Sequence, residues 1–245
     1  MRKFGLIGKN ISYSFSQNYF TDKFSSENIL DATYENFDID NIDTILNIFE
    51  NPEIVGCNVT IPYKETIIPY LDKLDKKAKN IGAVNTIKRH KNGKLTGYNT
   101  DCYGFKKTLK PHLKPFHKQA LILGTGGASK AIAFTLKELG ITYKFVSRTS
   151  KNPTQLTYNN LGESTISEHL IIINCTPLGT FPNVADAPNI PYQFLTKDHI
   201  LYDLIYNPEE TRFLNQGQLK NAITINGLQM LKFQAEKAWR IWNAN

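Results

Sequence analysis

Two segments of the chain carry side chains that could move a proton to or from a substrate. Residues 58–64 (NVTIPYK) place an amide, a hydroxyl and an ammonium group where an apolar strand ends. Residues 99–101 (NTD) follow a predicted hairpin and supply a carboxylate. Lys64 is expected at the start of a helix, where the helix dipole disfavours a cation, so it requires an anion or a function. Asp101 can be that anion, and on spacing alone a structural salt bridge and a catalytic pair are equally good interpretations.

A glycine-rich turn in the second half has the pattern of a dinucleotide-binding motif. Gly124-x-Gly126-x-x-Ser129 follows an apolar strand and opens a helix, whose N-terminus attracts phosphate. Gly124 permits the tight turn, while Gly126 and Gly127 let backbone N–H groups approach a pyrophosphate. Ser129 stands where the third glycine usually is, and it is small enough for close packing of the helix. A glycine-rich turn that binds no nucleotide is the alternative.

The residues after the next strand favour one coenzyme over the other. An NAD-binding unit usually has an Asp or Glu at this place, for the ribose 2′-hydroxyl. Here the strand ends in Ser147, Arg148 and Thr149, with no carboxylate. Arg148 can hold a 2′-phosphate, with Ser147 and Thr149 as hydrogen-bond partners and Lys151 adding charge. The pattern favours NADP over NAD, with a plain surface arginine as the alternative.

The elements that must position these residues alternate between strands and helices in the first half. The apolar pattern predicts strands over 3–7, 32–37, 54–60, 84–89 and 94–98, and helices over 16–24, 42–49, 64–71 and 74–79. Asn92-Gly93, between two of these strands, is the strongest local signal for a β-hairpin.

Continuous apolar runs in the second half indicate a parallel sheet covered on both faces. Strands are predicted over 120–123, 143–146, 170–175, 200–204 and 222–225, and helices over 128–139 and 228–242. Gly140 is placed to end the first of these helices. Residues 149–170 leave room for only weak helical structure, so one crossover is expected to be short. Residues 110–118, which include two prolines, are expected to connect the two halves.

These patterns predict a two-domain α/β protein, with an N-terminal α/β substrate domain and a Rossmann-type dinucleotide-binding domain. The substrate-binding and catalytic domain is expected over residues 1–100, completed by a C-terminal helix over 229–245. The NADP-binding domain is expected over residues 101–228.

Composition excludes several other classes of protein. The 245 residues contain no apolar run of membrane-spanning length and no signal-peptide core, so a soluble, cytoplasmic protein is expected. The three cysteines and five histidines show no metal-binding spacing, so neither a disulfide scaffold nor a metal site is expected. The net charge is +7, but the densest lysine cluster, over residues 72–79, is interleaved with carboxylates, which argues against nucleic acid.

The motifs together resemble the shikimate dehydrogenase family, along nearly the whole chain and in the family order. The matching segments are 11–16 (ISYSFS), 58–64 (NVTIPYK), 82–86 (GAVNT), 99–101 (NTD), 124–129 (GTGGAS), 147–149 (SRT) and 226–231 (NGLQML), followed by Gln234.

The resemblance implies a role for each matching residue. Lys64 and Asp101 take the catalytic positions. The residues implied to bind the substrate are Ser14, Ser16, Asn58, Thr60, Asn85, Tyr206 and Gln234. The residues implied to bind NADP are Gly124, Thr125, Gly126, Gly127, Ala128, Ser147, Arg148, Thr149, Thr176, Leu204 and Gly227.

This chain departs from the family pattern in two motifs. Residues 13–17 read YSFSQ in place of the usual His-Ser-x-Ser-Pro, which keeps both serines and loses the proline. Ser147 replaces the usual asparagine of the Asn-Arg-Thr element, which weakens the NADP assignment slightly. The chain is also short for the family, consistent with the short crossover. None of these departures alters Lys64 or Asp101.

The activity implied is the reversible, NADPH-dependent reduction of 3-dehydroshikimate to shikimate, a small-molecule reaction on the route to aromatic amino acids. It needs a hydride at carbon and a proton at the developing alkoxide, which Lys64 can donate while Asp101 orients it. A quinate/shikimate dehydrogenase that also uses NAD, and a non-catalytic cofactor-binding paralogue, are the alternatives. The absent carboxylate opposes the first, and the presence of Lys64 and Asp101 opposes the second. Both a monomer and a homodimer are compatible with the sequence.

Overall fold

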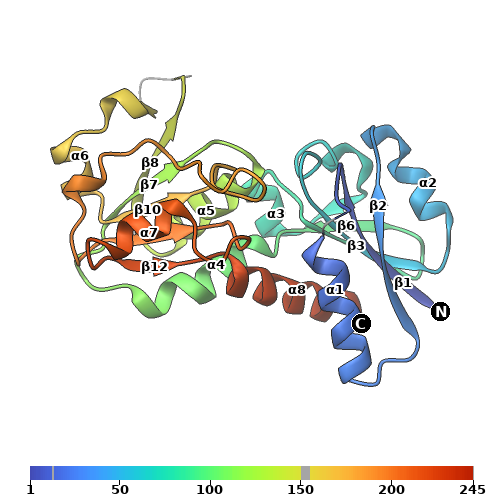
Figure 1. Cartoon of the computed structure of the whole chain (residues 1–245). Helices are drawn as coiled ribbons and strands as arrows, with labels where there is room; N and C mark the ends of the chain where they lie inside the picture. The colour runs from blue at the N-terminus through green and yellow to red at the C-terminus, as the bar shows by residue number, and fades with distance from the viewer. Residues whose placement is uncertain (13, 150–154, 245) are drawn as a thin grey trace. The chain divides into compact units, whose positions relative to one another are not determined.

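The computed structural model describes residues 1–12, 14–149 and 155–244, which form two compact α/β units (Figure 1). The first unit comprises residues 1–100 and 234–245, and the second comprises 101–233. Residues 110–118, expected to connect the two halves, lie instead inside the second unit, where they follow a helix and precede a strand. Along the part of the chain that the structure describes, no helix is long and apolar enough to cross a membrane.

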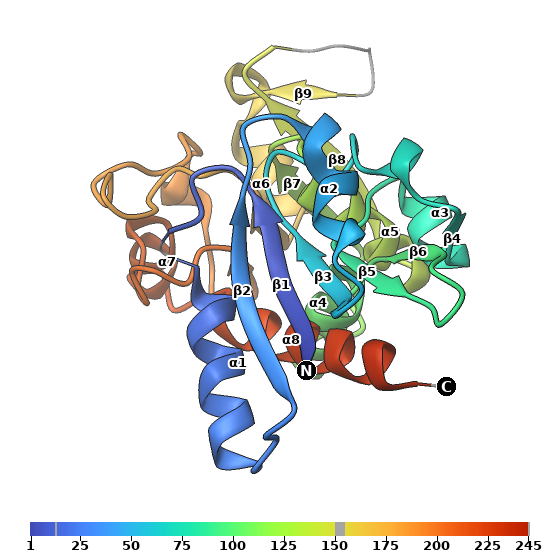
Figure 2. The same cartoon turned by 90° about the vertical axis from the view of Figure 1, so that its right-hand side faces the viewer.

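The first unit is built on a mixed sheet in the order β2-β1-β3-β5-β6-β4. Its strands are β1 (Arg2–Gly8), β2 (Ala32–Asp38), β3 (Ile54–Val59), β4 (Lys73–Leu74), β5 (Thr86–Arg89) and β6 (Leu95–Tyr98). Strand β1 lies between β2 and β3 and is parallel to both (Figure 2). Strands β5 and β6 are antiparallel and meet at Gly93, whose φ of +81° suits a tight turn, so the predicted hairpin is confirmed.

Helices cover both faces of this first sheet. They are α1 (Phe15–Ser26), the short η1 (Ile42–Thr44) leading into α2 (Ile45–Glu50), η2 (Ile68–Tyr70), α3 (Lys76–Ile81) and the C-terminal part of α8 (Leu228–Asn243). Phe4 of β1 packs with Phe20 of α1 and Trp242 of α8 in one apolar cluster. Ile45 of α2 packs with Val59 and Tyr63 in a second cluster. These two clusters hold β1 and β3 in place, and the residues of the 58–64 motif follow from the end of β3.

The helix predicted over residues 64–71 is wrong. The chain there makes a series of turns and only the single 3-10 turn of η2. Ile67 N donates to Tyr63 O at 3.0 Å and Ile68 N donates to Glu65 O at 3.2 Å, so local bonds of mixed span replace a regular helical ladder. Pro69 lacks an N–H to continue such a ladder, which explains why the apolar periodicity misled the prediction.

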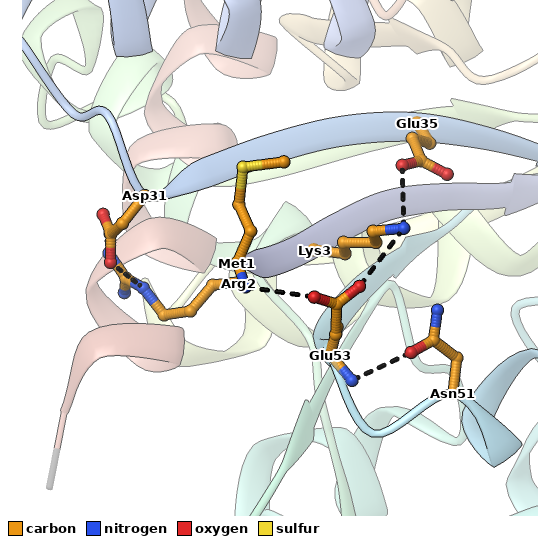
Figure 3. A network of polar contacts seen from close by, with 7 residues as sticks. All are labelled: Met1, Arg2, Lys3, Asp31, Glu35, Asn51 and Glu53. Atoms are coloured by element: carbon orange, nitrogen blue, oxygen red, sulfur yellow. Dashed lines mark hydrogen bonds and ion pairs between the residues drawn. The ribbon is translucent and has the colours of Figure 1, made fainter.

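A network of charged side chains joins the N-terminus of the chain to the edge of the first sheet (Figure 3). The Met1 amino group and Lys3 Nζ lie 3.0 Å and 3.4 Å from the carboxylate of Glu53, and Arg2 pairs with Asp31 at 2.8 Å. These side chains are substantially exposed, so each ion pair contributes little to stability and is screened by salt.

The second unit is built on a parallel sheet in the order β12-β11-β10-β7-β8-β9. Its strands are β7 (Gln119–Leu123), β8 (Thr142–Ser147), β9 (Leu156–Thr157), β10 (Ile171–Asn174), β11 (Ile200–Asp203) and β12 (Ile223–Ile225). Taken from β9, the strands follow the 3-2-1-4-5-6 order typical of dinucleotide-binding domains. The order reverses between β7 and β10, and the loops at the carboxyl ends of these two strands are where such folds bind ligands.

Helices flank this second sheet as the apolar runs predicted. They are α4 (Asp101–Leu109) with η3 (Lys110–His112), α5 (Gly127–Glu138), α6 (Glu163–Glu168), α7 (Arg212–Gln218) and the first residues of α8, with η4 (Tyr158–Asn160) and η5 (Tyr192–Phe194) as single 3-10 turns. Gly140, with φ +72°, follows the end of α5 as expected. Helix α6 is short, in agreement with the short crossover, whereas α4 and α7 were not predicted.

Candidate active site

The predicted carboxylate-binding serines lie at the start of α1. Ser14 is the N-cap residue, and its Oγ accepts a hydrogen bond from Ser16 N at 3.1 Å. Ser14 and Ser16 are both half-buried. The Ser16 hydroxyl also lies near enough to the phenol of Tyr34 to affect its pKa; Tyr34 is a residue of β2 for which the sequence motifs gave no role. Burial raises the pKa of the Tyr34 phenol well above its usual value, with Ser16 opposing the shift, so Tyr34 stays neutral.

Tyr34 connects these serines to Asn58 on β3. The Tyr34 hydroxyl donates to Asn58 Oδ1 at 2.9 Å. Asn58 Nδ2 in turn donates to Thr86 Oγ1 at 3.2 Å and to the Asn85 carbonyl at 3.3 Å. An asparagine amide has donors at one end and acceptors at the other, so these partners fix which end of Asn58 faces which strand.

Asn85 is the centre of the polar cluster in the first unit. Its side chain is 2% exposed, and its Oδ1 accepts from Thr100 N at 2.7 Å. Its Nδ2 donates to Thr100 Oγ1 and to Gln234 Oε1, both at 3.0 Å. Side chains from β2, β3, the strand β5 region and α8 therefore form one hydrogen-bonded network, in which Tyr34, Asn58, Thr86 and Asn85 follow one another and Asn85 also contacts Thr100 and Gln234.

Thr60 and Lys64 follow β3 in the same unit. Both are half-buried, and Lys64 lies within the turns after Pro62 rather than at a helix start. The expected conflict with a helix dipole therefore does not arise. The Lys64 carbonyl accepts from Val84 N at 2.7 Å, and the Tyr63 phenol donates to the Ile39 carbonyl at 2.6 Å. The backbone on both sides of the lysine is thus fixed by contacts that do not depend on the Lys64 side chain.

Asp101 belongs to the second unit, as the first residue of α4, and is 1% exposed. A carboxylate at a helix N-terminus is stabilised by the helix dipole. Asp101 directly follows Thr100, whose backbone N–H and hydroxyl are held by Asn85. The two residues predicted to be catalytic thus come from different compact units.

The glycine-rich turn joins β7 to α5 at the point where the strand order reverses. Gly124 has φ +101°, a conformation that strongly favours glycine, and Gly126 is the N-cap residue of α5. Within the described residues, no side chain caps this helix, and a Cβ added at Gly126 would meet nothing within 4 Å. Thr125 is exposed, while Ser129 is buried and donates to the Gly126 carbonyl at 2.6 Å. Gly127 and Ala128 form the first turn of α5, so this helix start fits a phosphate group.

The residues at the end of β8 remain open to solvent. Arg148 and Thr149 are exposed, and the Arg148 guanidinium lies near enough to Tyr158 to oppose the burial that raises the pKa of that phenol. Ser147 Oγ donates to the Thr149 carbonyl at 2.5 Å and accepts from Gln155 Nε2 at 2.7 Å. Lys151, expected to add charge, lies outside the described residues.

The remaining predicted residues lie at the carboxyl ends of β10, β11 and β12. Thr176 follows β10, and a Cβ added at Gly124 would lie 3.2 Å from its Cγ2. Leu204 N donates to the Asn174 carbonyl at 3.1 Å. A Cβ at Gly227 would lie only 2.1 Å from the Leu204 carbonyl oxygen, so only glycine fits there. Tyr206, two residues after Leu204, is half-buried in the same unit.

Sequence reasoning missed four polar residues of these clusters. Tyr34, Thr86 and Thr100 link the predicted substrate residues, and Asp203 ends β11 beside Asn174. Tyr34 lies between Thr33 and Glu35, at a position where an aromatic residue is typical of the core face of a strand, so nothing in the local pattern gives it a polar role. Thr86 and Thr100 belong to the matching segments 82–86 and 99–101, which was the available signal. An aspartate at the end of an apolar strand was the available signal for Asp203.

Comparison with known proteins agrees with this geometry. Residues 6–87 match the family model of the shikimate dehydrogenase substrate binding domain. The chain is 40% identical to a Methanococcus vannielii protein named shikimate dehydrogenase (NADP(+)), over 97% of this chain and 90% of that one.

Solved structures are also similar over both units. A shikimate dehydrogenase in complex with NADP⁺ superposes with a TM-score of 0.88 and 35% identity, covering 99% of this chain and 90% of the other. The Thermus thermophilus enzyme in complex with NADP(H) and shikimate gives 0.86 and 29%, covering 99% and 94%. The resemblance and fold class predicted from the motifs are confirmed, and the chain belongs to the shikimate dehydrogenase family.

Proposed function

We propose that this chain catalyses the reversible, NADPH-dependent reduction of 3-dehydroshikimate to shikimate. The observation that carries the proposal is the continuous hydrogen-bonded network from Tyr34 to Gln234 in a member of this family. It brings together alcohols and amides that are far apart in sequence. A polyol acid needs such groups for its hydroxyls and carboxylate.

The coenzyme fits the second unit. The start of α5, with the open position at Gly126 and the left-handed Gly124, can receive a pyrophosphate on backbone N–H groups. Exposed Arg148 can pair with a 2′-phosphate. Thr176, Leu204 and Gly227, at the carboxyl ends of their strands, complete the proposed coenzyme residues. When bound, NADPH supplies the hydride that reduces the ketone carbon.

The protein itself supplies binding, orientation and the proton. Ser14 and Ser16 donate to the substrate carboxylate, with Tyr206 as a further donor, while Asn58, Thr60, Asn85 and Gln234 bind hydroxyl groups. Lys64 donates a proton to the ketone oxygen as negative charge develops there, and takes a proton from the hydroxyl in the reverse direction. Asp101 accepts a hydrogen bond from a ring hydroxyl.

We further propose that residues 1–100 with 229–245 form the substrate domain and 101–228 the NADP domain. The family model that matches 6–87 supports the first assignment, and the strand order of the second sheet supports the second. A cytoplasmic location, and a monomer or homodimer as the functional form, complete the proposal.

An absorbance assay of the purified chain tests this function directly. Shikimate and quinate are each offered with NADP and with NAD, and formation of reduced coenzyme is followed. We expect the highest kcat/KM with shikimate and NADP. A higher value with quinate and NAD would establish the quinate/shikimate alternative. Coenzyme binding without turnover of either acid would establish a non-catalytic paralogue.

A further inference from the structure

Asp203, the last residue of β11, carries a fully buried carboxylate that accepts three hydrogen bonds. Thr211 Oγ1 donates to Oδ2 at 2.6 Å, while Ile205 N and Asn174 Nδ2 each donate to Oδ1 at 3.1 Å. Burying a carboxylate is costly, and an apolar residue of similar size would serve packing better. The groups that its two oxygens hold in place explain why a carboxylate is present here.

One branch of this network reaches the loop after β10. Asn174 ends β10, and its Nδ2 is directed to Asp203, which leaves its Oδ1 for Thr176. Asn174 Oδ1 accepts from Thr176 N at 3.0 Å and from Thr176 Oγ1 at 2.7 Å. A carboxylate can only accept, so Asp203 determines which end of the Asn174 amide faces Thr176.

The other branch reaches the loop after β11. Ile205 N donates to Asp203, and the Ile205 carbonyl accepts from Gly227 N at 2.9 Å. Leu204, between them, donates its N–H to the Asn174 carbonyl. The Asp203 side chain thus fixes the backbone of two loops at the carboxyl edge of the sheet. The loop after β10 lies across the strand-order reversal from the glycine-rich turn.

We propose that Asp203 is a positioning residue for the coenzyme, because its carboxylate fixes two loops, one with Thr176 beside Gly124 and one with Leu204 beside Gly227. This inference rests on the proposed function, which assigns Thr176 and Leu204 to the coenzyme. The space is narrow: a Cβ at Gly124 would lie 3.2 Å from Thr176 Cγ2 and 3.3 Å from the Cys175 backbone. A small displacement of the β10 loop therefore changes the shape of the turn.

Asp203→Ala tests the proposal, because it removes both acceptor oxygens. Thr211, Ile205 and Asn174 then lose the acceptor that they share. We expect the Kd for NADP and the Kd for NAD to rise by a similar factor, about tenfold. The KM for shikimate at saturating coenzyme is expected to stay close to that of the wild type. Both Kd values are measured by calorimetry, which needs no turnover, so failure of the proposed activity leaves this test intact.

Thr211→Val is the matched control. It removes the hydrogen bond to Oδ2 and also the cap of α7, in which Thr211 Oγ1 accepts from Leu214 N at 3.3 Å. It leaves the Asn174 branch in place. We expect a lower melting temperature and coenzyme Kd values within a factor of about two of the wild type. Equal loss of coenzyme affinity in Thr211→Val and Asp203→Ala would show general destabilisation and overturn the proposal.

Asn174→Ala provides a second variant that keeps the carboxylate and cuts the relay to Thr176. It is expected to weaken the binding of both coenzymes as Asp203→Ala does, and the effects in the double variant are expected to be less than additive. If either folded single variant binds NADP and NAD as tightly as the wild type, Asp203 does not position the coenzyme.

Discussion

Asn85 and Gln234 lie 149 positions apart in the chain, and their side chains share a hydrogen bond of 3.0 Å. Gln234 comes from α8, so this bond closes the polar cluster of the first unit with a residue from near the end of the chain. Asn85 also accepts a hydrogen bond from the buried backbone N–H of Thr100. Gln234, in contrast, is only half-buried. The two residues should therefore respond differently to truncation.

Asn85→Ala is expected to lower the free energy of unfolding by about 1–3 kcal/mol, because the buried Thr100 N–H loses its acceptor. Gln234→Ala is expected to raise the KM for shikimate with a much smaller loss of stability. Thermal melts and steady-state kinetics on both variants check the difference. A Gln234→Ala variant with a wild-type KM would remove Gln234 from the substrate residues.

Tyr34→Phe removes only the hydroxyl that connects Ser16 to Asn58. Without it, Asn58 Oδ1 lacks a donor, and the side chains of Ser16 and Asn58, both proposed to bind substrate, lose a contact that fixes their orientation. We expect the KM for shikimate to rise about tenfold, with a smaller change in kcat, as for lost ground-state positioning worth about 1.4 kcal/mol.

Tyr70→Phe is the control for this change, since it also removes a phenol hydroxyl in the first unit. The Tyr70 hydroxyl donates to Asp43 on the surface, so we expect kinetics like those of the wild type. Equal kinetic losses in the two variants would contradict a specific role for Tyr34.

Local chemistry explains how far sequence reasoning reached. The Asn92-Gly93 hairpin and the turn at Gly124 are set by backbone preferences of a few residues, so their patterns were sufficient. Residues 64–71 share the apolar spacing of a helix, but Pro69 and local turn bonds prevail. Tyr34 takes part through Asn58, which is distant in the chain, and no local pattern reports such a contact. For Asp203, the position at the end of an apolar strand was a signal, but its bond to Asn174 joins two strands and leaves no local pattern. The roles assigned to Lys64 and Asp101 stay predictions.

Arg148→Leu is expected to weaken NADP binding by about 1.5–3 kcal/mol and to leave NAD binding nearly unchanged. The physical reason is the loss of a charge-assisted contact to the 2′-phosphate, a group that NAD lacks. Because Arg148 is exposed, folding should be unaffected. Calorimetric titration with each coenzyme measures the effect, and equal weakening of both would show that Arg148 does not discriminate between them.

The buried carboxylate of Asp203 predicts a specific dependence of stability on pH. Burial raises its pKa from 3.8 to about 6, so the folded protein holds a proton that the unfolded chain has lost between these values. Stability should therefore fall as pH rises from about 4 to 6, by about 3 kcal/mol in total from this group. The neighbouring Cys175 thiol and Tyr192 phenol have pKa values raised by burial and stay protonated in this range.

Comparison with Asp203→Asn isolates this contribution from that of other carboxylates. Denaturant unfolding of both proteins is measured from pH 4 to 7, and the difference between their unfolding free energies is plotted against pH. The unfolding free energy of the variant should increase relative to that of the wild type as pH rises from about 4 to 6, and the difference should then stay constant. A difference that is independent of pH would mean that the carboxylate is ionised throughout.

Lys64 should be needed more in the transition state than in the ground state, because negative charge grows on the ketone oxygen as hydride arrives. Positioned acid catalysis typically contributes about 10²–10⁴-fold. Lys64→Ala is therefore expected to lower kcat by a factor in this range, while the KM for shikimate changes several-fold at most. Lys64→Met should behave in the same way, although it keeps much of the side-chain volume.

Both variants should fold, because the contacts that fix this turn come from the backbone. The Lys64 carbonyl accepts from Val84 N, and the Tyr63 phenol holds the Ile39 carbonyl, so neither bond needs the lysine side chain. Thermal melts near that of the wild type, together with a large loss of kcat, would separate catalysis from folding. A kcat within a factor of about three of the wild type, or a collapsed melt, would remove Lys64 from the catalytic role, since acid catalysis typically contributes far more.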